Sequence, residues 1–223
     1  MAIQGNHLKI IPAILDRPVR LGVLISGGGR TMENFADRIR QGSLRAEIPL
    51  VIASKAECTG IARARDAGLN CEIMTPQEFD SVAAYSAAIF ERMRELNVDL
   101  VVLAGFLSLV KIPDDFEFRV LNIHPALIPA FCGHGFYGSR VHRAAIERGV
   151  RVSGCTVHFA DNEYDHGPIL IQRTVMIPDE TTPEELADLV FEQECIAYPE
   201  AIRKVVSGRL QIEGQRTVMR RVP

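Results

Sequence analysis

The chain has 223 residues, of which 47% are hydrophobic and 24% are charged, a composition typical of a soluble globular domain. Its net charge of −3 argues against a protein that binds nucleic acid regardless of sequence, because such proteins need a basic face. The 5 cysteines are odd in number and lack a CxxC spacing, which argues against a disulfide framework and a zinc site. No apolar run approaches the roughly 18 residues that span a bilayer, and no secretory signal is visible, so we expect a cytoplasmic protein without a membrane partner.

Strand-like apolar runs alternate with helical patterns after an N-terminal arm at residues 1–19. The alternation predicts an α/β fold, with a Rossmann-like, mostly parallel sheet flanked by helices. In chain order we expect a strand at 21–25, a helix at 31–40, a strand at 49–54, a helix at 60–67, a strand at 71–74, a helix at 81–96 and a strand at 99–104. The last of these strands is apolar throughout, which indicates a central strand covered on both faces.

The second half of the chain changes character after a strand at 120–124 and a helix at 139–148. Residues 155–159 and 169–176 alternate in polarity, which predicts an antiparallel strand pair with the polar loop 161–167 at its tip. A long helix should begin near Thr182 and continue past Pro199 with a kink there. A small hairpin is expected at 210–212 and 217–219, and residues 20–223 are expected to form one domain.

A glycine-rich turn, Ser26-Gly-Gly-Gly-Arg-Thr31, lies between the first predicted strand and helix. Glycines let the backbone approach a ligand closely, and a helix N-terminus presents N–H groups and partial positive charge to an anion. The turn therefore fits a phosphate site, although a tight turn without a ligand explains the same residues. It matches neither a P-loop, because no Lys-Ser/Thr follows, nor the dinucleotide fingerprint, because Met32 replaces the third glycine.

Three polar residues, Asn122, His124 and Asp165, are candidates for a reacting centre. Asn122 and His124 end a predicted strand two positions apart, so their side chains should point to the same side. Asp165 lies in the loop between the antiparallel strands. Each residue alone has a simpler explanation, as a cap, a satisfied histidine or a turn aspartate. Of the remaining histidines, His134 and His142 are interpreted as surface groups and His158 as a strand residue.

Several short motifs together resemble the glycinamide ribonucleotide formyltransferase family. They occur in the family's order between about residues 20 and 212, and Asn-Ile-His-Pro followed by the later aspartate loop is a specific combination. The matching segments are 23–27 with the glycine turn, 101–106, 121–125 with Pro129, 156–159, 163–165 with Gly167 and Pro168, and 193–194 with Tyr198 and Pro199.

The resemblance implies formyl transfer from 10-formyltetrahydrofolate, as a co-substrate, to the amine of glycinamide ribonucleotide. Asn122 and protonated His124 would stabilise the oxyanion, while Asp165 would keep His124 charged and help a water molecule to carry the proton. The turn residues that would hold the ribose phosphate are Gly27, Gly28, Gly29, Arg30 and Thr31. Glu194 would contact the glycinamide substrate. The residues that would line the folate pocket are Leu107, Ser108, Leu109, Val110, Ala160, Asp161, Asn162, Glu163 and Tyr164.

The resemblance implies no metal and only small-molecule substrates as partners; it allows a homodimer. The sequence departs from the family's pattern in three places. The turn reads Gly27-Gly-Gly-Arg-Thr31 where many members have a polar residue between two glycines and then Ser-Asn, so that Arg30 either strengthens phosphate binding or points to solvent. Val82 follows Phe79-Asp80-Ser81, where some members carry an arginine near the folate's acidic tail, and the segment 131–138 is longer than in short members.

Three alternatives share parts of this pattern. Formyltetrahydrofolate deformylases use the same core with water as the attacking group, and usually carry an extra N-terminal domain. Formyltransferases that act on another amine usually carry an extra C-terminal domain. A non-catalytic nucleotide-binding module would have no use for Asn122, His124 and Asp165 together.

Overall fold

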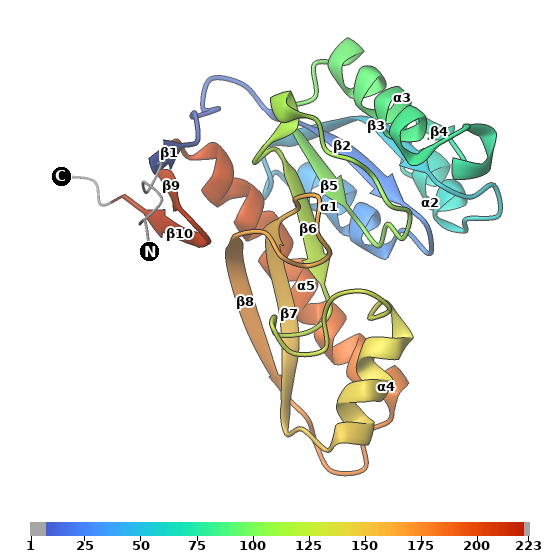
Figure 1. Ribbon diagram of the computed structural model, residues 1–223, viewed down its shortest axis with the longest axis vertical. Helices are drawn as coiled ribbons and strands as arrows, with labels where there is room; N and C mark the ends of the chain where they lie inside the picture. Colours follow the sequence, from blue (N-terminus) through green and yellow to red (C-terminus); the bar gives the residue numbers. More distant parts are fainter. Residues whose placement is uncertain (1–7, 221–223) are drawn as a thin grey trace.

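The computed structural model describes residues 8–220, which form two sheets and the helices that cover them (Figure 1). The strands of the large sheet are β2 (Val19–Ile25), β3 (Ala46–Ala53), β4 (Cys71–Ile73), β5 (Leu100–Leu103), β6 (Val120–His124), β7 (Val152–Phe159) and β8 (Ile169–Met176). Their order is β4-β3-β2-β5-β6-β7-β8; the strands from β4 to β6 are parallel, while β7 and β8 run antiparallel. The predicted mostly parallel α/β fold with a C-terminal antiparallel pair is confirmed.

Five α-helices connect and cover these strands. They are α1 (Arg30–Arg40), α2 (Gly60–Asp66), α3 (Val82–Glu95), α4 (Ser139–Arg148) and α5 (Pro183–Val206), with short 3-10 helices at Pro76–Glu78 and Asp114–Phe116. α5 begins next to Thr182 and includes Pro199, as predicted, and it starts with a capping box in which Thr182 and Glu185 satisfy each other's backbone N–H groups. In the described part of the chain, no helix has the length and apolar character needed to cross a membrane.

The alternation of side chains along the central strands creates a separate apolar core on each face of the sheet. Leu21, Val23 and Ile25 of β2 pack in the larger core with residues of α1, α2 and α5, while Leu24 packs on the opposite face with residues of α3. Side chains two positions apart in a strand share a face, which explains the division. Both faces of β2 are covered, as expected for a parallel sheet.

The N- and C-terminal segments meet in a second, three-stranded sheet. β1 (Leu8–Ile10) and β10 (Arg216–Met219) both pair antiparallel with β9 (Leu210–Glu213), next to the C-terminal end of α5 (Figure 1). The predicted terminal hairpin is therefore present. The predicted arm at 1–19 includes residues 1–7, which lie outside the described residues, while residues 8–10 form β1, a strand that the sequence analysis did not predict.

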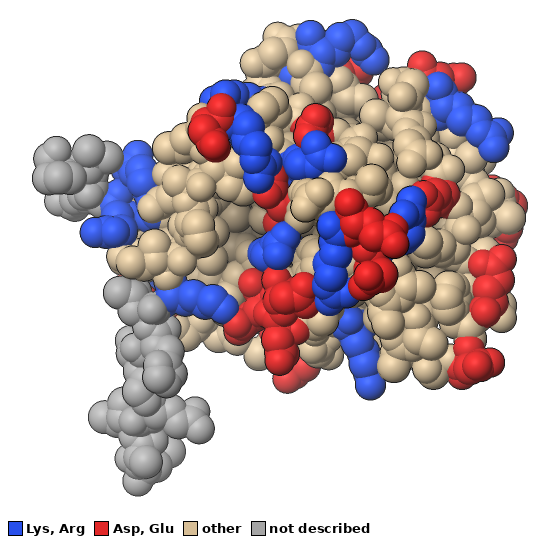
Figure 2. All heavy atoms as spheres, turned by 90° about the horizontal axis from the view of Figure 1, so that it is seen from above, with Lys and Arg blue, Asp and Glu red and all other residues tan. Residues whose placement is uncertain are grey.

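Surface charges of opposite sign lie next to one another on the face shown in Figure 2. Ion pairs such as Arg94–Asp115 (2.9 Å) and Arg173–Glu200 (2.9 Å) join separate elements of the described chain. Exposed pairs of this kind contribute about 0–1 kcal/mol each, so the packing of the two cores dominates stability.

Tyr198 connects α5 to β5 and to β6, the strand that carries Asn122 and His124. Its side chain is fully buried, and its hydroxyl lies 2.8 Å from the carbonyl oxygen of Leu121 and 3.2 Å from that of Leu103. Its ring also packs edge-on against Phe35 of α1, at 5.1 Å between centroids. Because Leu121 precedes Asn122, this hydroxyl helps to hold the end of β6 in place.

We predict that Tyr198→Phe lowers the free energy of unfolding by about 1–3 kcal/mol, because two buried carbonyl oxygens lose the same donor while the ring stays in place. Urea unfolding followed by circular dichroism measures the change. Tyr164→Phe, at a side chain that is 53% exposed, is the matched control and should change stability by less than about 0.5 kcal/mol. Equal stability of Tyr198→Phe and the wild type would show that these hydrogen bonds do not stabilise the fold.

Candidate active site

A cavity of about 520 Å³ opens where the parallel strands β2, β5 and β6 end. Every residue that the sequence analysis proposed for the site lines this one cavity. These residues are Gly27, Gly28, Gly29, Arg30, Thr31, Leu107, Ser108, Leu109, Val110, Asn122, His124, Ala160, Asp161, Asn162, Glu163, Tyr164, Asp165 and Glu194. Segments far apart in the sequence therefore converge at the place where open α/β sheets bind ligands.

The glycine turn joins β2 directly to the N-terminus of α1. Gly29 is the N-cap with φ +72°, and no side chain caps the helix. A side chain at Gly29 would clash with the backbone of Gly60, whereas one at Gly27 or Gly28 would meet no protein atom within 4 Å. Both the N–H group of Gly60 and the Cys58 thiol donate to the carbonyl oxygen of Gly27. The turn is thus fixed by Cys58 and Gly60 on one side and open towards the cavity on the other, an arrangement that suits an anion.

Asn122 and His124 lie at the end of β6 and face the same cavity. The antiparallel register places Asn122 opposite His158 of β7. The Asn122 amide nitrogen lies 3.1 Å from Nε2 of His158 and 3.4 Å from Oδ1 of Asp165. The structure therefore brings the three predicted polar residues together, and His158 joins them.

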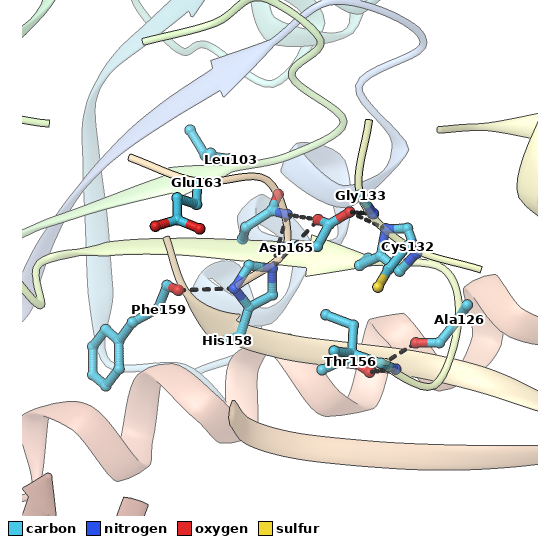
Figure 3. Close-up of polar contacts among 12 residues, drawn as sticks. Leu103, Ala126, Cys132, Gly133, Thr156, His158, Phe159, Glu163 and Asp165 are labelled. Atoms are coloured by element: carbon cyan, nitrogen blue, oxygen red, sulfur yellow. Dashed lines mark hydrogen bonds and ion pairs between the residues drawn. The ribbon is translucent and has the colours of Figure 1, made fainter. Parts of the chain in front are cut away.

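Asp165 is the centre of this cluster, and its side chain is only 10% exposed. Its Oδ2 accepts a hydrogen bond from the N–H group of Gly133 at 2.8 Å, and Figure 3 shows the carboxylate between His158 and Gly133. Burial alone would raise the pKa of Asp165, but interactions with His158, His124 and the Gly133 N–H group outweigh it, and the pKa lies below its usual value. The carboxylate is therefore held in its ionised form.

Both ring nitrogens of His124 face oxygen atoms. Nε2 lies 2.8 Å from the carbonyl oxygen of Phe131, and Nδ1 lies 3.4 Å from Oδ2 of Asp165. Only the imidazolium form can donate to both oxygens. Burial nevertheless lowers the pKa of His124 below 6.5, against the opposing effects of Asp165 and the Phe131 carbonyl. Asp165 thus favours the predicted charged form, while burial opposes it.

The cavity is also lined by His142 and His158, which the sequence analysis did not include in the site. Nδ1 of His158 donates to the carbonyl oxygen of Phe159, which leaves Nε2 as the acceptor for Asn122 when the ring is neutral. The interpretation of His142 as a surface group is wrong: it is 5% exposed, on the inner side of α4, and its Nδ1 has no hydrogen-bond partner among the described residues. His134 is exposed, as expected.

Apolar side chains surround the mouth of the cavity. Leu107, Leu109 and Tyr164 are half-exposed there, and Ile112 and Asn162 hydrogen-bond to join the two predicted folate-lining stretches. The longer segment 131–138 also contributes to the lining, through Gly133, Gly135, Phe136, Tyr137 and Gly138. Val82 is the first residue of α3 and is not among the lining residues. The mouth can therefore enclose a flat ring between apolar walls.

Glu194 lies on the face of α5 that lines the cavity, close to the glycine turn. Burial raises the pKa of Glu194 to about 7, and the nearby positive charge of Arg30 opposes this shift. Among the described residues, 8–220, no group of three or more His, Cys, Asp or Glu side chains has a metal-binding arrangement.

Comparisons with known proteins agree with the geometry. Residues 19–202 match the family model described as "Formyl transferase". The chain is 38% identical to "Phosphoribosylglycinamide formyltransferase, chloroplastic" of Vigna unguiculata, covering 93% of this chain and 67% of that protein. It is 35% identical to "Phosphoribosylglycinamide formyltransferase" of Haemophilus influenzae, covering 87% and 90%. The crystal structure of glycinamide ribonucleotide transformylase 1 from Symbiobacterium toebii is similar with a TM-score of 0.86 and 41% identity, covering 93% and 96%.

We predict that Glu194 makes the stability of the protein fall as the pH rises from about 4.5 to about 7. Over this range the unfolded chain loses the Glu194 proton while the folded protein retains it, so ionisation favours unfolding. In the Glu194→Gln variant the side chain does not titrate. The free energy of unfolding of the variant minus that of the wild type should therefore rise by at most about 3 kcal/mol between pH 4.5 and 7, and should stay constant above this range.

Urea unfolding at a series of pH values measures this difference. Glu192→Gln, at an exposed position of the same helix, is the matched control and should show no comparable gain. A difference between Glu194→Gln and the wild type that does not change with pH would contradict the raised pKa.

Proposed function

The chain belongs to the formyl transferase family, and we propose that it transfers the formyl group of 10-formyltetrahydrofolate to the amine of glycinamide ribonucleotide in purine biosynthesis. One observation carries the proposal: Asn122, His124 and Asp165 meet in a cavity that is also lined by the glycine turn and by the half-exposed apolar side chains of Leu107, Leu109 and Tyr164. The names of the relatives, phosphoribosylglycinamide formyltransferase, support formyl transfer to this acceptor.

The proposal assigns the phosphate of the ribonucleotide to the glycine turn. Gly27 and Gly28 leave room for close approach of the backbone, the N-terminus of α1 favours an anion, and Arg30 supplies a cation. Glu194, on the facing side of α5, would contact the glycinamide part of the same substrate. The amine would then point towards the polar cluster at the end of β6.

The formyl donor would occupy the apolar end of the cavity. Residues 107–110 and 160–164 lie on the two sides of this region, where the Ile112–Asn162 hydrogen bonds hold them together. A flat pterin ring fits between such walls, because apolar side chains provide contact area and the flanking backbone provides hydrogen-bonding groups. This placement brings the formyl group next to Asn122.

The reaction would proceed by attack of the neutral amine nitrogen on the formyl carbon. A carbon–nitrogen bond forms, and the electron pair of the carbonyl moves to its oxygen to give a tetrahedral oxyanion. Asn122 would stabilise this oxyanion by hydrogen bonding, and protonated His124 would stabilise it by its positive charge. Collapse of the oxyanion breaks the bond to the folate nitrogen, giving the formylated amine and tetrahydrofolate.

Asp165 would manage the proton that moves during this exchange. The attacking amine loses a proton and the leaving folate nitrogen gains one, so a group between them must accept and return it. Asp165 is ionised and could accept a proton through a water molecule that connects it to both nitrogens, and its lowered pKa would make it return that proton readily. Its negative charge would also stabilise the cationic form of His124.

We predict that Asp165→Asn lowers turnover by at least about 100-fold, because the amide cannot accept the proton or favour the charged form of His124. Steady-state formyl transfer, followed by folate absorbance, gives the rate, and calorimetry with ribose 5-phosphate gives phosphate-ligand binding, which should remain nearly unchanged. Asp115→Asn, which removes an exposed carboxylate paired with Arg94, is the control and should retain full activity. Equal loss of turnover and of ribose 5-phosphate binding would show that Asp165 has only a structural role.

The proposed reaction itself is tested by mixing the protein with 10-formyltetrahydrofolate, with and without glycinamide ribonucleotide. We expect folate absorbance to change only when the amine is present, with one formylated product for each tetrahydrofolate formed. Release of formate without the amine would show a deformylase instead. No change in either mixture would contradict both activities.

A further inference from the structure

Arg30 is held at the edge of the cavity by two residues of α5. Its guanidinium carbon lies 3.9 Å from the ring centroid of Phe191, and its Nη1 lies 3.0 Å from Oδ1 of Asp188. Arg30 is the first residue of α1, directly after the glycine turn. The stacking on Phe191 therefore holds a cation next to the N-terminus of α1, while the ion pair with Asp188 occupies one of its N–H groups.

The packing of α1 on α5 repeats this contact one helical turn further along. The side chain of Asn34, four residues after Arg30, donates to the carbonyl oxygen of Cys195, four residues after Phe191. The spacing of i and i+4 places both residues of each helix on one face. Neighbouring contacts at a regular interval show that the two helices hold Arg30 and Phe191 in register.

The charges of the cavity make Arg30 distinctive. Among the described residues that line the cavity it is the single Lys or Arg, while the acidic lining residues are Asp161, Glu163, Asp165, Glu184 and Glu194. A phosphate dianion near so many carboxyl groups needs a cation beside it. Guanidinium is suited to this, because its flat shape stacks on an aromatic ring while its N–H groups bind phosphate oxygens.

We propose that Phe191 and Asp188 are positioning residues that determine how tightly Arg30 binds the substrate's phosphate. Phe191 holds the guanidinium plane beside the glycine turn, and Asp188 competes with the phosphate for the same N–H groups. Phosphate binding exchanges the exposed Asp188 carboxylate for a phosphate oxygen, while the stacking on Phe191 persists. This inference rests on the proposed function, since it assumes that a phosphate occupies the turn.

The competition explains why the two α5 residues act in opposite directions. Both members of the Arg30–Asp188 pair are exposed, with side-chain exposures of 50% and 70%, so the pair is weak and can exchange. Removing Asp188 frees the guanidinium and removes a negative charge near the phosphate. Removing the aromatic ring of Phe191 releases the guanidinium from its place, which costs binding.

The test measures binding of ribose 5-phosphate by calorimetry at constant ionic strength, with ribose as the control without phosphate. Arg30→Ala should weaken binding of ribose 5-phosphate at least about tenfold, because it removes the cation. Arg30→Lys should weaken it about threefold, because Lys keeps the charge but has no flat face to stack on Phe191. Phe191→Leu should weaken it about two- to fivefold, and Phe191→Tyr should restore the wild-type value. Asp188→Asn should tighten it about two- to fivefold.

Asp179→Asn is the matched control for Asp188, because it also removes an exposed carboxylate paired with an arginine, here Arg151. It should leave binding unchanged. In formyl-transfer assays, Phe191→Leu and Asp188→Asn should change KM for glycinamide ribonucleotide in the same directions and leave kcat nearly unchanged.

The outcomes separate the two proposals. Wild-type binding of ribose 5-phosphate that is insensitive to Phe191→Leu and Asp188→Asn would overturn this inference and leave the proposed function standing. Weaker binding in Asp188→Asn would also overturn it, because it would make Asp188 a support and not a competitor. No binding of ribose 5-phosphate by the wild-type protein would overturn both the phosphate role of the turn and the inference built on it.

Discussion

The buried carboxylate of Asp165 is the interaction on which the arrangement of the site depends. It accepts a hydrogen bond from the N–H group of Gly133, and its oxygen atoms lie 3.4–3.7 Å from side-chain nitrogens of His124, His158 and Asn122. These partners come from β6, β7 and the segment before α4, so one side chain joins three separate parts of the chain to its own loop. A buried carboxylate without such partners would be protonated or would destabilise the fold, so the cluster and the position of the loop depend on each other.

The order of the parallel strands determines where the cavity opens. The chain continues from β2 to β3 on one side, while β5 pairs with β2 on the other, so the connections diverge between β2 and β5. This divergence leaves a crevice at the carboxyl ends of the two strands. Ser26 joins the segments around this crevice. Its hydroxyl accepts a hydrogen bond from the N–H group of Leu107 and also hydrogen-bonds to the hydroxyl of Ser54. The glycine turn and the segment 107–110, for which we propose a folate contact, thus share one anchor.

Local patterns in the sequence were enough to predict the order of the strands and helices of the large sheet. The spacing of apolar residues and the positions of turn residues are short-range features that can be read within a few residues. The contacts of His158 were not predictable in the same way. Its position on a strand is evident, but its contact with Asn122 depends on the register of β7 against β6, which the alternating pattern alone does not specify. β1 was missed for a related reason: its three residues form a strand only because β9, about 200 positions later in the chain, pairs with them.

The charge distribution of the cavity also gives a bound substrate one direction. Arg30 and the N-terminus of α1 lie at one end, and the ionised Asp165 lies at the end of β6. A ligand with a phosphate at one end and an amine at the other is attracted in this orientation and repelled in the reverse one. Glu194 also lines the cavity near Arg30, and with a pKa of about 7 it can be neutral beside a phosphate or ionised beside an ammonium group. In the proposed reaction, these charges would therefore orient the amine towards Asn122, His124 and Asp165.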